Sequence, residues 1–186
     1  MTDELTVLGI PGSLRKASFN RALLRVAIEL APAGVKFETA DISQVPPYDQ
    51  DVHDAGLPPS VVALREAIKK ADALLFVTPE YNYSVPGVLK NAIDWASRPP
   101  EQPFAGKPMG VIGASGGPGG TMRAQYHLRQ IAVFLDMHPI NKPELFVRSA
   151  ASLFDATGKL TDEPTRALLV KYLEALAAWT RRLRAH

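Results

Sequence analysis

The distribution of apolar residues divides the chain into short apolar runs that alternate with longer stretches of helical spacing. The runs at 5–10 and 73–78 are almost continuously apolar, which is typical of parallel strands buried on both faces. The run at 35–41 alternates more and fits a strand nearer an edge of the sheet. A fourth strand is predicted at 108–115, and a fifth within 137–147, where two prolines make its start irregular.

The stretches between these runs predict helices over 19–31, 59–71, 86–97, 120–136 and 162–184. The apolar faces are expected to carry Leu23, Leu24, Ala27 and Ile28 in the first helix, Val62, Leu64 and Ile68 in the second, and Leu169, Tyr172, Leu173, Leu176, Trp179 and Leu183 in the last. The segment 42–58 shows no clear periodicity and is predicted to be a surface flap.

Strict alternation of strand and helix indicates a parallel sheet with helices on both faces. The sequence therefore predicts an α/β fold, a three-layer sandwich around a five-stranded parallel sheet, as a single domain over 1–186. In such folds ligands bind beyond the carboxyl ends of the strands. The loops to consider are those after the first, third and fourth strands, at 11–19, 79–85 and 114–120.

The composition and net charge of the 186-residue chain exclude several classes of function. Because there is no cysteine, disulfides and thiol redox relays are excluded, and redox chemistry requires a bound cofactor. A net charge of +2 is too small to indicate a nucleic-acid partner. The acidic N-terminus and the lack of an apolar run of about 20 residues predict no signal peptide, no membrane span and a cytoplasmic location. The histidines show no metal-ligand spacing, so no metal site is expected.

The first loop reads PGSLRKASFN, 11–20, and leads directly into a helix. A helix N-terminus favours a phosphate, to which Ser13, Ser18 and Asn20 can donate hydrogen bonds while Arg15 pairs with its charge. The alternative for Ser18 is that it only caps the helix. Dinucleotide and P-loop fingerprints are absent, so the loop suits the single terminal phosphate of a mononucleotide.

The second and third loops have the composition of a cradle for a flat, polar ligand. In PEYNYS, 79–84, the backbone and Asn82 can read the edge of a heterocycle, and Tyr81 or Tyr83 can cover a ring face. In ASGGPGGTMR, 114–123, glycines allow close backbone approach, and Ser115 offers a hydroxyl. The alternatives are a local turn in which Glu80 is a surface charge, and a plain flexible glycine turn.

Together, GSLRKASFN (12–20), PEYNYSVPGVLKNAIDWASR (79–98) and ASGGPGGTMR (114–123) resemble the NAD(P)H-dependent FMN reductase family, whose flavodoxin-like members include quinone and chromate reductases. The resemblance extends along nearly the whole chain. It implies a flavodoxin-like fold, bound FMN, and NADPH or NADH as the hydride donor. It also implies a homodimer or homotetramer with the flavin near a subunit interface, to which Arg123, Tyr126 and Glu144 would contribute.

The resemblance assigns cofactor contacts motif by motif. The FMN phosphate would be held by Ser13, Arg15, Ser18 and Asn20, with Leu14 and Phe19 alongside. The isoalloxazine ring and ribityl chain would lie against Pro79, Glu80, Tyr81 and Asn82, and the other edge of the ring against Ser115, Gly116 and Gly117. No side chain is expected to act as a catalytic acid or base, because the flavin carries the chemistry.

The implied activity is an FMN-dependent NAD(P)H oxidoreductase. It would pass a hydride through FMN to a small-molecule acceptor, a quinone, flavin, azo compound or metal oxyanion, by a ping-pong mechanism. A non-catalytic flavodoxin-like electron carrier is the main alternative, and a domain that has lost FMN is a second. The carrier is disfavoured, because flavodoxins are expected to be strongly acidic whereas this chain carries a net charge of +2.

Overall fold

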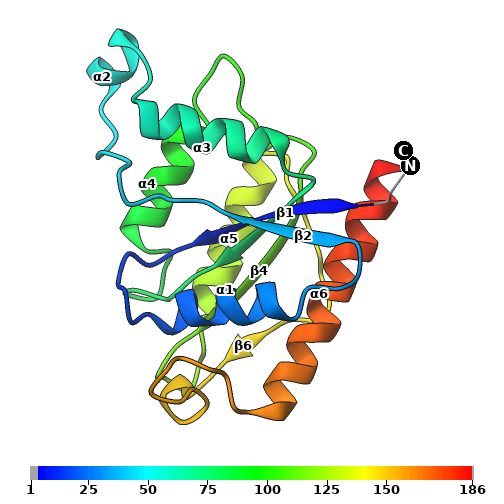
Figure 1. Cartoon of the computed structure of the whole chain (residues 1–186). Coiled ribbons are helices and arrows are strands. Elements are labelled where there is room, and N and C mark those ends of the chain that lie inside the picture. Colours follow the sequence, from blue (N-terminus) through cyan, green and yellow to red (C-terminus); the bar gives the residue numbers. More distant parts are fainter. Residues whose placement is uncertain (1–3, 186) are drawn as a thin grey trace.

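A computed structural model describes residues 4–185 as one parallel sheet with helices on both sides (Figure 1). The strands are β1 (Leu5–Pro11), β2 (Val35–Thr39), β3 (Ala73–Val77), β4 (Pro108–Ala114), β5 (His138–Pro139) and β6 (Phe146–Val147). Their order is β2-β1-β3-β4-β5, and β6 also pairs with β4. All named pairs are parallel, so the loops after β1, β3 and β4 leave the same edge of the sheet.

The helices form the two outer layers. They are α1 (Phe19–Glu29), α2 (Gln50–Ala55), α3 (Pro59–Lys70), α4 (Gly87–Ala96), α5 (Met122–Phe134) and α6 (Glu163–Arg184), with a short 3-10 turn at Ala150–Ser152. In Figure 1, α1 and α6 lie on one face of the sheet and α3, α4 and α5 on the other. Each face buries its own apolar cluster. The predicted flavodoxin-like three-layer fold is confirmed.

The predicted fifth strand is wrong in detail, because two short strands replace it. β5 pairs with the beginning of β4 and β6 with its end, and on this side of β4 no described strand pairs with Val111, which faces β3 on its other side. Tyr172 of α6 fills this gap: its hydroxyl donates to the Val111 carbonyl at 3.0 Å and accepts from the Val111 N–H at 2.6 Å. Burial raises the pKa of this hydroxyl, which keeps it protonated as a donor.

Two smaller corrections concern the outer layer. The segment 42–58, which has no clear periodicity and is predicted to be a surface flap, contains the short helix α2, whose N-terminus is capped by Asp49 through the Asp51 N–H at 2.9 Å. Ile28 and Val62, predicted to be core residues, are 40% and 44% exposed. Each lies one position beyond the buried stripe of its helix, and a step of one residue turns a side chain by about 100°.

Candidate functional site

The loop after β1 keeps several backbone donors free. Ser13 and Ser18 are buried, and Ser18 caps α1 by accepting from the Asn20 N–H at 3.2 Å. Within residues 4–185, the N–H groups of Leu14, Lys16 and Ala17 donate to no acceptor. The first turn of α1 contains no acidic residue. The loop therefore presents unpaired N–H groups, two hydroxyls and a helix N-terminus, a set of donors that fits a phosphate.

The side chains of Asn20 and Arg15, both predicted to contact the phosphate, also have partners within the protein. The amide of Asn20 is buried, donates to the Ala114 carbonyl at 2.8 Å and accepts from the Ala114 N–H at 2.8 Å. It thus ties the start of α1 to the end of β4, which brings the first and third loops together. Arg15 is exposed and donates to the Ala17 carbonyl at 3.1 Å, which leaves its remaining N–H groups to solvent. Phe19 packs against Phe154, with ring centroids 5.5 Å apart.

The loop after β3 forms a tight hairpin turn. Tyr81 and Ser84 exchange two backbone hydrogen bonds, of 3.1 and 3.0 Å. The two residues between them, Asn82 and Tyr83, have φ values of 50° and 64°, the left-handed pair that such a turn requires. Asparagine tolerates this conformation, whereas a bulky residue such as tyrosine adopts it only when its surroundings hold it there.

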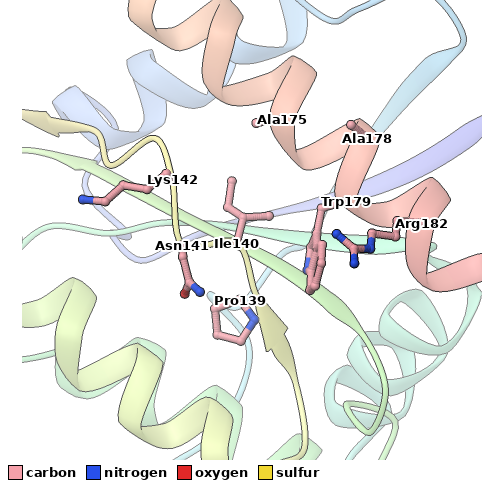
Figure 2. A pocket seen from close by; sticks show the side chains of 8 residues that line it. All are labelled: Pro139, Ile140, Asn141, Lys142, Ala175, Ala178, Trp179 and Arg182. Carbon is pink, nitrogen blue, oxygen red and sulfur yellow. The ribbon is translucent and has the colours of Figure 1, made fainter.

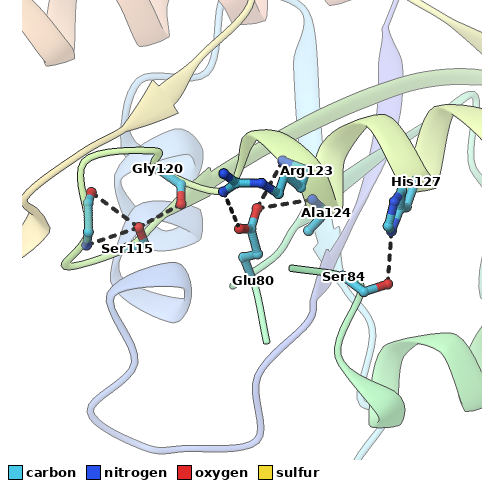
Figure 3. A network of polar contacts seen from close by, with 8 residues as sticks. Glu80, Ser84, Ser115, Gly120, Arg123, Ala124 and His127 are labelled. Atoms are coloured by element: carbon cyan, nitrogen blue, oxygen red, sulfur yellow. Dashed lines mark hydrogen bonds and ion pairs between the residues drawn. The ribbon is translucent and has the colours of Figure 1, made fainter. Parts of the chain in front are cut away.

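Contacts to α5 hold this hairpin in place (Figure 3). The Glu80 carboxylate accepts from the N–H groups of Arg123 and Ala124 at 2.9 and 3.1 Å, and from the Arg123 guanidinium at 3.3 Å. The same guanidinium lies 3.9 Å from the centroid of the Tyr83 ring. Ser84 Oγ lies 2.9 Å from His127 Nδ1, one helical turn further along. Glu80 is therefore not a free surface charge.

The glycine loop after β4 is ordered by one hydroxyl. Ser115 Oγ donates to the Gly120 carbonyl at 2.6 Å and accepts from the Gly117 N–H at 3.3 Å, as Figure 3 shows. A Cβ added at Gly116 would meet nothing within 4 Å, so the outer surface of the loop is open to an approaching ligand. The serine thus shapes the loop, while the glycine backbone faces outward.

A pocket of about 730 Å³ lies between the second and third loops. It is lined by Glu80, Asn82, Tyr83, Ser115, Gly117, Pro118, Gly119, Gly120 and Arg123. The first loop borders two neighbouring hollows, one reached by Ser13 and Leu14 and the other by Ser18 and Phe19. Arg15, Asn20, Pro79, Tyr81 and Gly116, although predicted as site residues, line none of these three spaces.

Sequence reasoning overlooked His127 and gave Arg123 only a role at a subunit interface. Both belong to the first two turns of α5, and the spacing of four residues between them was the available signal. Tyr126, on the same helix, donates to Glu144 at 2.7 Å, and this hydrogen bond lowers the pKa of the Glu144 carboxyl. The contribution of these side chains to a subunit interface stays a prediction.

A second pocket, of about 410 Å³, lies between α6 and the segment after β5 (Figure 2). Trp179 forms part of its wall and donates its indole N–H to the His138 carbonyl at 2.8 Å. Lys142 and Arg182 lie toward opposite ends of this pocket in Figure 2. None of the sequence-predicted site residues line it.

Two features are absent from the described residues. Residues 4–185 contain no group of three or more His, Asp or Glu side chains that could bind a metal ion. Among the helices described there, none has the length and apolar character needed to cross a membrane.

Comparison with known proteins gives concordant matches. The profile of the NADPH-dependent FMN reductase family matches residues 5–152. An NAD(P)H-dependent FMN reductase of Pseudomonas aeruginosa is 60% identical over 184 residues, covering 99% of this chain and 100% of the relative. A quinone reductase of Escherichia coli K12 is 46% identical over 187 residues, covering 99% and 100%. A solved flavoenzyme NAD(P)H:(acceptor) oxidoreductase from Paracoccus denitrificans superposes with a TM-score of 0.88 at 38% identity, covering 96% and 98%.

Proposed function

This chain belongs to the NADPH-dependent FMN reductase family, and from that premise we propose that it reduces quinones and related small molecules at the pocket between its second and third loops. It is an oxidoreductase that uses FMN as its cofactor and NAD(P)H as its donor. The choice of acceptor, the order of the two half-reactions and the residues that hold FMN are part of the proposal.

One observation supports the proposed position of the cofactor. The loops after β1, β3 and β4 leave the same edge of the sheet, and the first of them has N–H groups without acceptors within residues 4–185. We assign the FMN phosphate to this first loop, through Ser13, Ser18, Arg15 and the free N–H groups. We assign the ring to the 730 Å³ pocket, which residues of the second and third loops line.

The donor set fits the charges of the cofactor. A phosphate carries close to two negative charges and is stabilised by a helix N-terminus and by Arg15. The ring has a polar edge, and open glycine backbone can approach it without side chains between them. Bound FMN would supply the redox chemistry of the site, the transfer of a hydride from NAD(P)H and of two electrons to the acceptor.

The roles left to the protein are binding, orientation and the exclusion of competing reactions. NAD(P)H and the acceptor would use the same face of the site in turn, which makes the kinetics ping-pong. A quinone takes up two electrons and two protons to become a hydroquinone, and water can supply the proton that does not arrive with the hydride. No described side chain is needed as a catalytic acid.

The relatives support a small-molecule acceptor, since the Pseudomonas aeruginosa protein is named for FMN and the Escherichia coli protein for quinone. We further propose that the chain folds as one domain, because both apolar clusters pack on one sheet. A homodimer or homotetramer working in the cytoplasm, where nicotinamide nucleotides are supplied, completes the proposal.

The test is an anaerobic stopped-flow experiment on FMN-loaded protein mixed with NADPH and, separately, with NADH. Rapid loss of the oxidised-flavin absorbance, followed by its return on adding a quinone, is the expected result. Firm FMN binding without bleaching would favour a flavodoxin-like electron carrier instead. Failure to bind FMN would contradict the assignment of all three loops.

A further inference from the structure

Glu80 has an unusual position for an acidic residue in a cofactor cradle. Its side chain is only 10% exposed, although it borders the 730 Å³ pocket. All three of its hydrogen bonds go to the start of α5, two of them to backbone N–H groups and one to the Arg123 guanidinium. The carboxylate thus already has its partners within the protein and is not free to receive a ligand.

The contacts of Glu80 cross the pocket from one wall to the other. The residue leads into the hairpin turn of Tyr81–Ser84, while Arg123 and Ala124 follow the glycine loop. Charge-assisted hydrogen bonds at a helix N-terminus are among the stronger polar contacts in proteins. This carboxylate therefore links the two walls of the pocket.

The hairpin needs such a restraint. Asn82 and Tyr83 both have positive φ, and for tyrosine this conformation is unfavourable unless its surroundings support it. The Tyr83 ring lies against the guanidinium that Glu80 binds. Loss of the carboxylate would therefore free Arg123 as well and remove two supports of the turn at once.

We propose that Glu80 is a positioning residue, which holds the flavin-facing hairpin at the correct distance from the glycine loop without itself binding the cofactor. The inference rests on the proposed function, because it takes this pocket to be the place of the FMN ring. In this proposal the Glu80 carboxylate of the PEYN segment binds the start of α5 and does not contact the flavin ring.

The test compares Glu80→Gln with Asp162→Asn. Asp162 is a matched control, because its carboxylate caps the start of α6 by accepting from the Thr165 N–H at 2.9 Å and borders none of the site hollows. In the apoprotein, Glu80→Gln is expected to speed amide exchange at Ser84, the donor of a hairpin hydrogen bond, about tenfold. The FMN dissociation constant should rise about tenfold. Asp162→Asn should leave both quantities within about twofold.

A second variant covers the case in which Glu80→Gln fails to fold. Arg123→Met removes one Glu80 contact and the cation above Tyr83 but leaves both backbone N–H bonds. The FMN dissociation constant is then expected to rise about threefold.

The outcomes separate this inference from the proposed function. If the parent protein binds FMN and is bleached by NADPH, while Glu80→Gln and Asp162→Asn behave alike in exchange and affinity, Glu80 is only a helix cap and the inference is overturned. If the parent protein binds no FMN, the proposed function fails, and the exchange measurement on the apoprotein still decides whether Glu80 holds the hairpin.

Discussion

Two helix N-termini flank the candidate site, and they differ in whether their backbone N–H groups already have acceptors within the protein. At α1 the cap is the neutral hydroxyl of Ser18, and preceding N–H groups in the described chain have no acceptor. At α5 the protein's own Glu80 carboxylate already accepts from two N–H groups. Both ends carry the same partial positive charge. The N-terminus of α1, where the preceding N–H groups are free within the described chain, is an open end that can bind an external dianion. The N-terminus of α5, which is bound to Glu80, is a closed end that connects two parts of the fold.

The largest expected effect comes from closing the open end. Ser18→Asp retains a good helix cap but places a carboxylate where the FMN phosphate is proposed to bind. Because like charges in contact repel strongly, the FMN dissociation constant should rise about 100-fold, or about 2.7 kcal/mol. Quenching of FMN fluorescence measures it. Ser18→Thr is the control and should bind FMN as the parent does; equal binding by Ser18→Asp would remove the phosphate from this loop.

The next effect concerns the residue that fixes the open end to the sheet. Asn20→Ala leaves the N–H and carbonyl of Ala114 without their side-chain partners. The free energy of unfolding should fall by about 2 kcal/mol, since both groups lose buried hydrogen bonds. Thermal or urea unfolding measures the change, and FMN affinity should fall with it.

Tyr172→Phe provides the comparison on the same strand. It removes the partner of Val111, away from the loops, and should lower stability similarly while leaving FMN affinity unchanged. Loss of FMN affinity in both variants would mean that Asn20 acts on binding through stability alone.

A smaller effect is expected from the exposed cation beside the open end. Arg15→Ala should raise the FMN dissociation constant about tenfold at low salt, through loss of the proposed charge-assisted contact to the phosphate. Because the residue is exposed, raising the ionic strength should shrink the difference from the parent. Titrations at two salt concentrations test this, and a salt-independent difference would argue against a charge effect.

The smallest expected effect is the pH dependence of stability contributed by Asp162, a helix cap away from the site. Hydrogen bonds from Thr165 lower the pKa of the Asp162 carboxyl. A carboxyl whose pKa is lower in the folded state stabilises the protein above its unfolded pKa, and this contribution is lost as the pH falls through the folded value. Asp162→Asn should therefore be slightly less stable than the parent at neutral pH. Thermal unfolding as a function of pH should show the two converging below about pH 3.9.

The three-layer fold and the positions of the three loops could be predicted from the sequence, because both depend on local patterns. Continuous apolar runs predicted β1 and β3, and hydroxyl- and glycine-rich loops followed them at one edge. It did not foresee that Asn20 would bond to Ala114, 94 positions away, or that Glu80 would bond to α5. An amide or carboxylate looks the same in a sequence whether its partner is a ligand or a distant backbone group.

The same difficulty explains the wrong fifth strand. The apolar pattern of 137–147 matches a strand, but the hydroxyl that interrupts the pairing belongs to α6. Neither Pro139 nor Pro143 can donate a backbone hydrogen bond, and this was the one local sign of an irregular edge. A side chain that takes the place of a strand in this way can be recognised only in the folded structure, where the helix and the sheet lie together.

The Tyr172 hydroxyl also has a consequence for the order in which the molecule is made. One hydrogen-bonding position of β4 is completed by α6, since Tyr172 follows Val111 by 61 positions in the sequence. A growing chain that has not yet released α6 from the ribosome holds a sheet with an unfinished edge at Val111. Chains that stop before residue 172 are therefore expected to be cleaved faster by proteases than chains that include α6.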